Sequence, residues 1–169
     1  RNALECARPG RHGAVVIDLP KDVQNWQGPF KGEGDLDIRG YRQRMSALQK
    51  SAVTEAQCNS FFAMLGEAER PLIYAGGGVI NGEASEALRR FAGDLGLPVV
   101  TTLMGIGAYD TTLPLSLRML GMHGAAFANY AVEDCDFLVA LGARFDDRVT
   151  GVPERFARNA KCIAHIDVD

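Results

Sequence analysis

The segment from Gly142 to Gly151 (GARFDDRVTG) places two arginines and two aspartates between two glycines. Arginine holds phosphate or carboxylate through paired hydrogen bonds, and glycine lets the backbone approach a ligand closely. The segment therefore predicts a loop that binds a polyanionic ligand at the end of a strand. The alternative is a solvated turn whose charges pair with each other.

A second segment, Gly76–Gly82 (GGGVING), is rich in glycine. Glycine N–H groups at the start of a helix can face a phosphate, although a simple tight turn has the same composition. The spacing departs from the dinucleotide fingerprint, because Asn81 takes the place of its third glycine. Thr101, Thr102 and Leu103 stand where a ribose-binding acid is expected. A conventional NAD site is therefore disfavoured.

Two further loops, Thr101–Gly107 (TTLMGIG) and Leu120–Gly124 (LGMHG), offer hydroxyls, methionines and glycines. Met122 suits packing against a flat ring, and a place in the core is the alternative. His123 has no acidic or cysteine neighbour, which favours a structural role over a catalytic one. The four loops together favour a long nucleotide cofactor. They contain no nucleophile with a base and no pair of acids, so we predict no catalytic residue in this chain.

Alternating strands and helices must position these loops. Apolar runs predict strands at 14–19, 71–75, 98–101, 136–141 and 162–166, and periodic segments predict helices at 54–67, 83–95 and 125–133. The order predicts an α/β fold, a Rossmann-like parallel sheet with helices on both faces and right-handed crossovers. All four loops should then meet at one edge of the sheet.

Two of the predicted helices have defined inward faces. The inward residues of the first are Cys58, Phe61, Phe62 and Leu65, and those of the second are Ala87, Leu88, Phe91 and Leu95. Gly96 is expected to end the second helix.

The chain divides, by composition, into three parts. Residues 1–23 are predicted to be the end of a preceding domain, 24–50 a polar linker, and 51–169 a domain that is truncated at its end. Arg1 at the start, and an end at Asp169 where the strand predicted at 162–166 would lead into its functional loop, lead us to expect a piece of a longer polypeptide.

Bulk composition excludes several classes of protein. The chain has 169 residues, 47% hydrophobic and 23% charged, which is typical of a globular domain with a core, and its net charge of −3 disfavours nucleic acid. Four cysteines and three histidines show no metal-ligand spacing, so no metal site is predicted. Isolated cysteines fit a reducing compartment. No signal peptide or membrane-spanning apolar run is visible.

Several strings, in this order and spacing, resemble one enzyme family: RPGRHGAVVIDLPKDVQ, YAGGGV, TTLMGIGAYD, LGMHG, GARFDDRVTG and HIDVD. They are similar to the large catalytic subunit of acetohydroxyacid synthase, the anabolic acetolactate synthase, over essentially the whole chain. This enzyme depends on thiamine diphosphate (ThDP). The combination of GARFDDRVTG with LGMHG is specific, since related non-flavin enzymes lack the full first string.

The resemblance implies a parent enzyme with three α/β domains. The outer two would bind ThDP and Mg²⁺ between subunits, and the middle one, a six-stranded Rossmann-like domain, would bind FAD without net redox chemistry. The parent, a transferase, would decarboxylate pyruvate and join the remainder to a second 2-ketoacid. The products would be 2-acetolactate or, with 2-ketobutyrate, 2-aceto-2-hydroxybutyrate, in branched-chain amino-acid biosynthesis. This segment alone would be inactive.

The resemblance also implies residue roles. The positions that match FAD contacts or border the flavin are Arg11, Gly76, Gly77, Gly78, Thr102, Leu103, Met104, Leu120, Gly121, Met122, His123, Gly142, Ala143, Arg144, Asp146, Arg148, Val149, Asp167 and Val168. The Arg11 string is GRHGAV here, so His12 and Ala14 replace two prolines of the family string. The positions that match the substrate channel, where sulfonylurea and imidazolinone herbicides bind, are Lys21, Met122, Asp147 and Arg148.

Arg148 is further implied to hold the carboxylate of the second ketoacid. The implied partners are a second copy of the chain, as a homodimer or homotetramer, and a small regulatory subunit. The implied location is the cytoplasm of a bacterium, or a plastid or mitochondrion of a eukaryote. Two alternatives keep the fold: the central domain of another ThDP-dependent decarboxylase or carboligase, and a nucleotide-binding module without catalysis.

Overall fold

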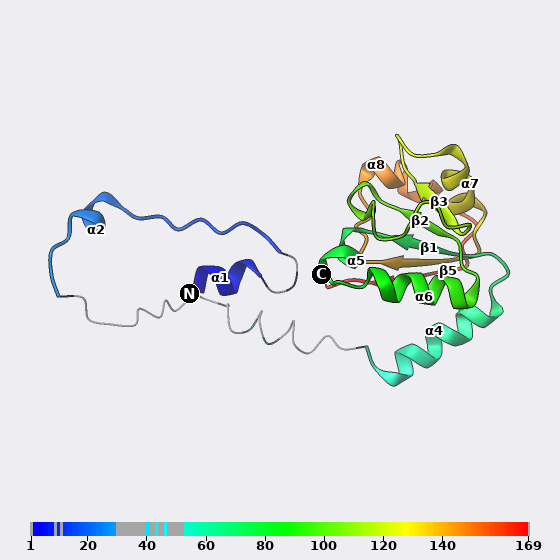
Figure 1. Ribbon diagram of the computed structural model, residues 1–169, viewed down its shortest axis with the longest axis horizontal. Coiled ribbons are helices and arrows are strands. Elements are labelled where there is room, and N and C mark those ends of the chain that lie inside the picture. The colour runs from blue at the N-terminus through cyan, green and yellow to red at the C-terminus, as the bar shows by residue number, and fades with distance from the viewer. Residues whose placement is uncertain are drawn as a thin grey trace. The chain divides into compact units, whose positions relative to one another are not determined.

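The computed structural model describes residues 2–8, 10, 12–29, 40, 43, 46 and 53–168 (Figure 1). The chain divides into two units, of which the second spans Val53–Asp167. Each unit is described by itself. Most of the predicted linker at 24–50, together with Arg11, lies outside the described residues.

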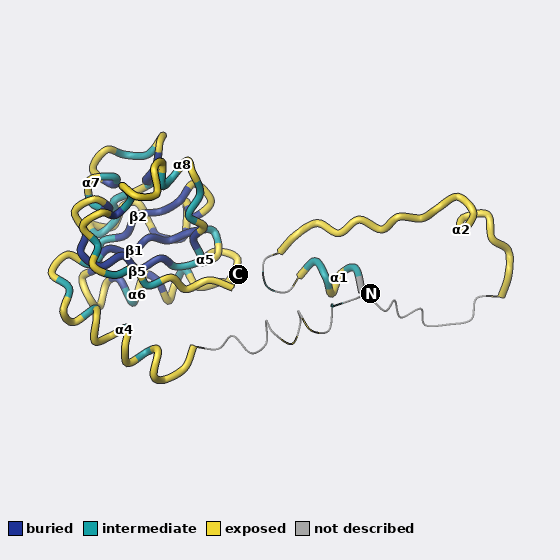
Figure 2. The backbone as a smooth tube through the Cα atoms, turned by 180° about the vertical axis from the view of Figure 1, so that it is seen from behind, coloured by how far each residue is buried: buried dark blue, intermediate teal, exposed yellow. Residues whose placement is uncertain are grey.

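The described part of the first unit is exposed for most of its length, as the yellow stretch around α2 in Figure 2 shows. It contains α1 (Asn2–Ala7) and α2 (Lys21–Asn25). The predicted strand at 14–19 is wrong: this stretch has no strand partner, and Val16 and Ile17 are 89% and 66% exposed. A strand exists only when a neighbour takes its N–H and C=O groups, and the described residues provide none here.

Five parallel strands form the sheet of the second unit, which confirms the predicted α/β class. They are β1 (Pro71–Ala75), β2 (Val99–Thr101), β3 (Ser116–Met119), β4 (Phe137–Leu141) and β5 (Cys162–Ile166), in the order β3-β2-β1-β4-β5. The predictions for β1 and β5 have the observed bounds, and those for β2 and β4 begin one residue early. The strand β3 was not predicted.

Three long helices flank the sheet: α4 (Glu55–Glu67), α6 (Ser85–Leu95) and α7 (Ala126–Asp134). Thr54 starts α4 through a capping box with Gln57, and Gly96, in the left-handed conformation with a φ of 66°, ends α6 as predicted. The shorter α5 (Gly77–Asn81) and α8 (Asp147–Thr150) and the 3-10 turns η1 (Leu103–Gly105) and η2 (Pro153–Arg155) lie in the connections.

Each face of the sheet has its own core, and the central strands between them are the dark blue traces of Figure 2. Residues of α4, α5 and α6 pack on one face around Ile73 and Val99. Residues of α7 and α8 pack on the other around Tyr74 and Leu138. Figure 1 shows these two helical layers on opposite sides of the strands.

Parts of the predicted inward faces are wrong. Phe62 and Leu95 are 55% and 49% exposed, and Ala87 is also exposed. The buried stripe of α4 is narrow, since Phe61 and Leu65 pack against the core and the partly exposed Met64 reaches Cys162 of β5. In α6 the turn at Gly96 brings Leu97 into the core beside Ala92, in the place expected for Leu95.

The direction of winding reverses between β1 and β4. The connection from β1 to β2, through α6, and that from β2 to β3, through Tyr109, pack on one face. The connections from β3 to β4 and from β4 to β5 pack on the other. Open α/β sheets bind ligands outside the carboxyl ends of the strands at such a reversal. The turns that follow β1 and β4 therefore define the expected binding edge.

Candidate functional site

The four predicted loops all follow carboxyl ends of parallel strands, those of β1, β2, β3 and β4. They therefore share the edge of the sheet that includes the reversal. The loop Leu120–Gly124 reaches this edge because it follows β3, the strand that the sequence pattern did not reveal. Convergence at one edge was the geometric requirement of the ligand-binding hypothesis.

The turns after β1 and β4 touch through bare backbone. The Gly78 N–H donates to the Gly142 carbonyl at 2.9 Å, and the Gly76 N–H donates to the Leu141 carbonyl at 2.9 Å. A Cβ atom on Gly76 would lie 2.1 Å from the Gly142 oxygen, and one on Gly78 would lie 2.6 Å from the Gly142 Cα. We call this contact of Gly76, Gly78 and Gly142 the glycine seam. It requires glycine for close packing of the chain against itself.

Backbone donors remain beside the glycine seam. Within the part of the chain that the structure describes, the N–H groups of Gly77 and Arg144 donate no hydrogen bond. Gly77 is the first residue of α5, where the helix itself offers no acceptor. Its Cβ position faces η1, 3.0 Å from the Met104 Cβ. Two N–H groups on either side of the reversal are thus available to an anionic ligand.

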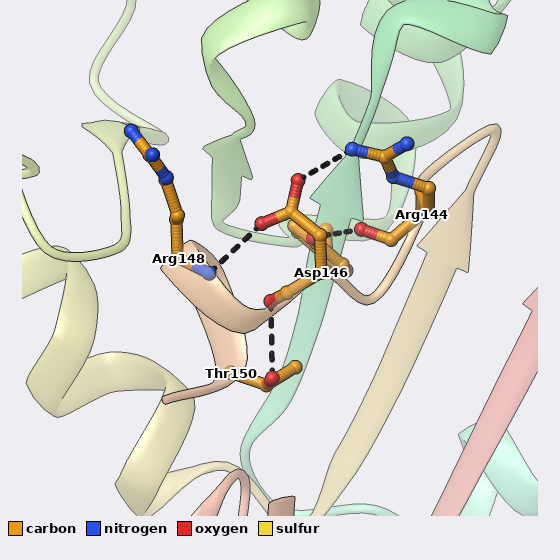
Figure 3. Close-up of polar contacts among 5 residues, drawn as sticks. Arg144, Asp146, Arg148 and Thr150 are labelled. Carbon is orange, nitrogen blue, oxygen red and sulfur yellow. Dashed lines mark hydrogen bonds and ion pairs between the residues drawn. The ribbon is translucent and has the colours of Figure 1, made fainter. Parts of the chain in front are cut away.

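Asp146 organises the segment after β4 (Figure 3). One of its carboxylate oxygens accepts from the Arg144 guanidinium at 2.9 Å, and the other accepts from the Arg148 N–H at 3.0 Å, which starts α8. The Thr150 hydroxyl donates to the Asp146 carbonyl at 3.0 Å. The hydrogen bond from Arg144 is the main reason that the pKa of Asp146 is lowered. The self-paired alternative thus describes Arg144 and Asp146.

Arg148 is different from Arg144. Its side chain is exposed and points away from Asp146 in Figure 3, and the guanidinium makes no hydrogen bond or ion pair with any described residue. Its backbone is held at both ends, because its N–H donates to Asp146 and its carbonyl accepts from the Met122 N–H at 3.0 Å. Arg148 therefore has a fixed backbone and a guanidinium whose five donors are open to a ligand.

The loop after β3 lies against α8 at this point. A pocket of about 340 Å³ is lined by both elements and by α7, including Gly121, Met122, Asn129, Asp147 and Arg148. Met122 is 71% exposed, so the alternative that it packs in the core is wrong. His123 is exposed as well, and no catalytic partner accompanies it among the described residues.

Several predicted ligand contacts have buried side chains. Thr102, Leu120 and Ala143 are at most 8% exposed, and the Thr102 hydroxyl caps η1 by accepting from the Gly105 N–H at 2.9 Å. Val149 packs against the core beside Tyr74. The side chains of these residues support the loops from the core and are not exposed to a ligand at the edge. Leu103 and Met104, at 68% and 76% exposed, present apolar side chains at the edge itself.

The remaining predicted positions are at the end of β5 and in the first unit. Asp167 and Val168 directly follow β5, where an Asp167 carboxylate oxygen lies 3.8 Å from the His165 Nε2. Lys21 is the exposed first residue of α2 in the first unit. Arg11 lies outside the described residues.

Sequence reasoning missed three residues that hold the loops in place. The Tyr74 hydroxyl donates to the Arg144 carbonyl at 3.1 Å, and burial is the main cause that raises its pKa to about 12. The His165 Nε2 lies 3.0 Å from the Ala143 carbonyl. Asn129 makes two hydrogen bonds to Gly121. Tyr74 lies in an apolar strand, His165 in β5 and Asn129 inside α7. Their sequence surroundings indicate a strand or a helix but do not indicate these long-range contacts.

The described residues contain neither a cluster of metal ligands nor a membrane-spanning helix. No group of three or more His, Cys, Asp or Glu side chains that could hold a metal ion occurs among them. No helix of the described ranges has the length and apolar character needed to cross a membrane.

Comparison with known proteins adds a family to this geometry. Residues 58–169 match the family described as thiamine pyrophosphate enzyme, central domain. Acetolactate synthase 1, chloroplastic, of Zea mays is 46% identical over 169 residues, covering 100% of this chain and 25% of that protein. Acetolactate synthase 2, chloroplastic, of Nicotiana tabacum is 45% identical, with 100% and 24% covered. Acetolactate synthase, chloroplastic, of Arabidopsis thaliana is 45% identical, with 99% and 24% covered. The chain spans about a quarter of the length of these relatives.

Proposed function

Because the chain belongs to the thiamine pyrophosphate enzyme family through its central domain, we propose that it is the FAD-binding middle part of an acetolactate synthase. The parent enzyme condenses pyruvate, after its decarboxylation, with a second 2-ketoacid. The products are 2-acetolactate and 2-aceto-2-hydroxybutyrate. ThDP, bound with Mg²⁺ by flanking domains, supplies the carbon centre that makes decarboxylation possible. The residues of this chain bind FAD, orient the second ketoacid and enclose the substrate channel.

The edge at the reversal fits a flavin nucleotide. The N–H groups of Gly77 and Arg144 suit the oxygens of a diphosphate, which are acceptors only. The exposed side chains of Leu103, Met104 and Met122 suit a flat apolar ring. The glycine seam keeps this stretch of the edge clear of side chains. Asp167, after β5, has the carboxylate that ribose hydroxyls require, at the end of the neighbouring strand.

Arg148 carries the substrate part of the proposal. An unpaired guanidinium whose backbone is fixed on both sides can bind a carboxylate through two parallel hydrogen bonds without first breaking another ion pair. In the parent enzyme it would orient the second ketoacid for addition, and such orientation accelerates a two-substrate step. The open guanidinium of Arg148, on a backbone held at both its N–H and its carbonyl, is the observation on which the substrate assignment rests.

Replacement of Arg148 tests this assignment in the full-length protein. Arg148→Ala should raise the KM for the second ketoacid by at least about ten-fold, with flavin content and thermal stability close to wild type. Arg158→Ala is the matched control, since Arg158 is an exposed arginine in the turn before β5, at the other end of the strands. An unchanged KM in the Arg148 variant would remove Arg148 from the substrate site. A purified parent protein without flavin absorbance would contradict the FAD assignment.

The remaining parts of the proposal concern the whole protein. The parent associates as a homodimer or homotetramer and pairs with a small regulatory subunit, and it accepts 2-ketobutyrate as an alternative second substrate. Its location is a plastid in a plant, as the names of the relatives state for those proteins, and the cytoplasm in a bacterium.

A further inference from the structure

We propose that Asn129 is a positioning residue for the second-substrate site, because it fixes the loop that holds Arg148 in place. The inference rests on the proposed function of Arg148. Asn129 lies on α7 and is half-buried, and it was not among the residues that the sequence pattern singled out. Its contacts, however, lead to Arg148 in two steps.

The first step joins Asn129 to Gly121. The Asn129 Oδ1 accepts from the Gly121 N–H at 2.8 Å, and its Nδ2 donates to the Gly121 carbonyl at 3.1 Å. One side-chain amide therefore satisfies both polar groups of one backbone residue, much as a neighbouring strand would. Gly121 has a φ of 96°, a backbone conformation that favours glycine. The loop after β3 changes direction at this residue, and the two hydrogen bonds hold the turn.

The second step joins this loop to α8. The N–H of Met122, the next residue, donates to the Arg148 carbonyl at 3.0 Å. A Cβ atom on Gly121 would lie 3.0 Å from the same Arg148 oxygen, so the two backbones are in direct contact. Asn129, Gly121, Met122 and Arg148 all line the pocket of about 340 Å³.

The direction of the Arg148 side chain depends on this chain of contacts. No described residue makes a hydrogen bond or ion pair with its guanidinium, so the position of its backbone decides where the side chain begins. Asp146 holds the N–H of Arg148, and the Met122 loop holds its carbonyl. Loss of the Asn129 amide leaves the Gly121 N–H without its acceptor and leaves the Gly121 carbonyl with the Gly124 N–H, at 2.9 Å, as its remaining donor. The loop that holds the Arg148 carbonyl is then less restrained. A small displacement of a positioning group is enough to lower the rate of a two-substrate reaction strongly.

The ratio of CO₂ released to acetohydroxyacid formed is a useful measurement here. A variant that is merely less stable makes less of both products and leaves this ratio unchanged. Two 2-ketoacids give one acetohydroxyacid and one CO₂ when every decarboxylation is followed by addition. When the second ketoacid is not held, the decarboxylated fragment takes up a proton and leaves as acetaldehyde, so pyruvate plus a proton gives acetaldehyde plus CO₂. The ratio of CO₂ to acetohydroxyacid then rises above one.

The experiment compares four full-length proteins loaded with FAD, ThDP and Mg²⁺: wild type, Asn129→Ala, Asn159→Ala and Arg148→Ala. Asn159 is the matched control, because its Nδ2 also donates to a backbone carbonyl, that of Glu133, at 2.7 Å, but it contacts neither loop. We expect Asn129→Ala to raise the CO₂ ratio, and the KM for 2-ketobutyrate by about ten-fold, at unchanged flavin content. Asn159→Ala should keep both values of the wild type.

The outcomes separate this inference from the proposed function. A raised ratio in Arg148→Ala with a wild-type ratio in Asn129→Ala overturns the role of Asn129 alone. A wild-type ratio in Arg148→Ala overturns the substrate role of Arg148 and with it this inference. If Asn129→Ala fails to fold, Asn129→Asp decides, since it keeps the size of the side chain and the acceptor for Gly121 but loses the donor. That variant must also raise the ratio.

Discussion

The hydroxyl of Tyr74, in the middle of the sheet on β1, donates a hydrogen bond of 3.1 Å to the carbonyl of Arg144, in the segment after β4. The two residues are 70 positions apart in the sequence. The Tyr74 ring lies within 5.5 Å of the Phe145 ring and 6.4 Å of the Phe156 ring, measured between centroids. The charged segment is therefore fastened to the core by an aromatic cluster and one buried hydroxyl.

Removal of this hydroxyl should loosen the segment. Tyr74→Phe keeps the ring contacts but leaves the Arg144 carbonyl without its donor, which should lower the free energy of unfolding by about 1 kcal/mol. Urea denaturation of the full-length protein measures the change. Tyr109→Phe is the control, because the Tyr109 ring is also in the core, at 3% exposed, but its hydroxyl makes no hydrogen bond with any described residue. Equal losses in the two variants would contradict the role of Tyr74.

The glycine seam should tolerate no side chain. In Gly78→Ala the added Cβ would lie 2.6 Å from the Gly142 Cα, so the two turns must separate at a cost of about 1–3 kcal/mol in unfolding free energy. Flavin retention should fall in the same variant. Gly93→Ala, in α6, has no atom within 4 Å of the new Cβ and should stabilise the helix by about 0.5–1 kcal/mol. A stable, fully flavinated Gly78→Ala protein would refute the seam.

Acid should destabilise the domain through Asp136, the residue before β4. Its carboxylate accepts from the Glu69 and Arg70 N–H groups at 2.8 and 2.9 Å, and the bond from Glu69 is the largest cause of its lowered pKa. A lowered folded-state pKa gives stability that is present above the ordinary value of 3.8 and is lost as pH falls through the folded value. Unfolding free energy should therefore decrease below about pH 4. In Asp136→Asn this dependence should be weaker, and parallel denaturation curves for the two proteins would contradict it.

Charge alone should not replace Arg148. Arg148→Lys keeps the cation but loses the planar pair of donors that matches a carboxylate. We expect a KM for the second ketoacid between those of wild type and Arg148→Ala, measured by steady-state kinetics on the full-length protein. A lysine variant with wild-type KM would show that a positive charge is sufficient and that the paired hydrogen bonds of the guanidinium are not needed.

The parts of the fold that sequence patterns predicted are those with dense apolar runs. The strands β1 and β5 were found with their observed bounds because PLIYA and CIAHI lie between clear breaks. The strand β3 was missed, since SLRM alternates weakly and lies at the edge of the sheet, where Arg118 is exposed. The opposite error occurred at 14–19, where AVVIDL is rich in β-branched residues but has no partner strand in the described part.

The sequence predicted which loops form the candidate site, but it did not predict which side chains pair with each other within it. The loop strings predicted that four loops share one edge of the sheet, as they do, because chemistry-bearing residues follow apolar strands. The division of labour between Arg144 and Arg148 was not predictable, since it depends on which arginine reaches Asp146. The N-terminal cap formed by Asp146 had a signal, an aspartate directly before a short polar run, and it could have predicted α8. The contacts of Tyr74 and Asn129 join distant segments and leave no local pattern.

The glycine seam joins two crossovers that cover opposite faces of the sheet, so its parts cannot open independently of the core. The amides of Gly76 and Gly78 are bonded across it, and their hydrogens should exchange with solvent only when the whole domain opens. A nucleotide that binds at this place would therefore slow exchange throughout both layers. Higher occupancy by the cofactor would then lengthen the time that the domain stays folded.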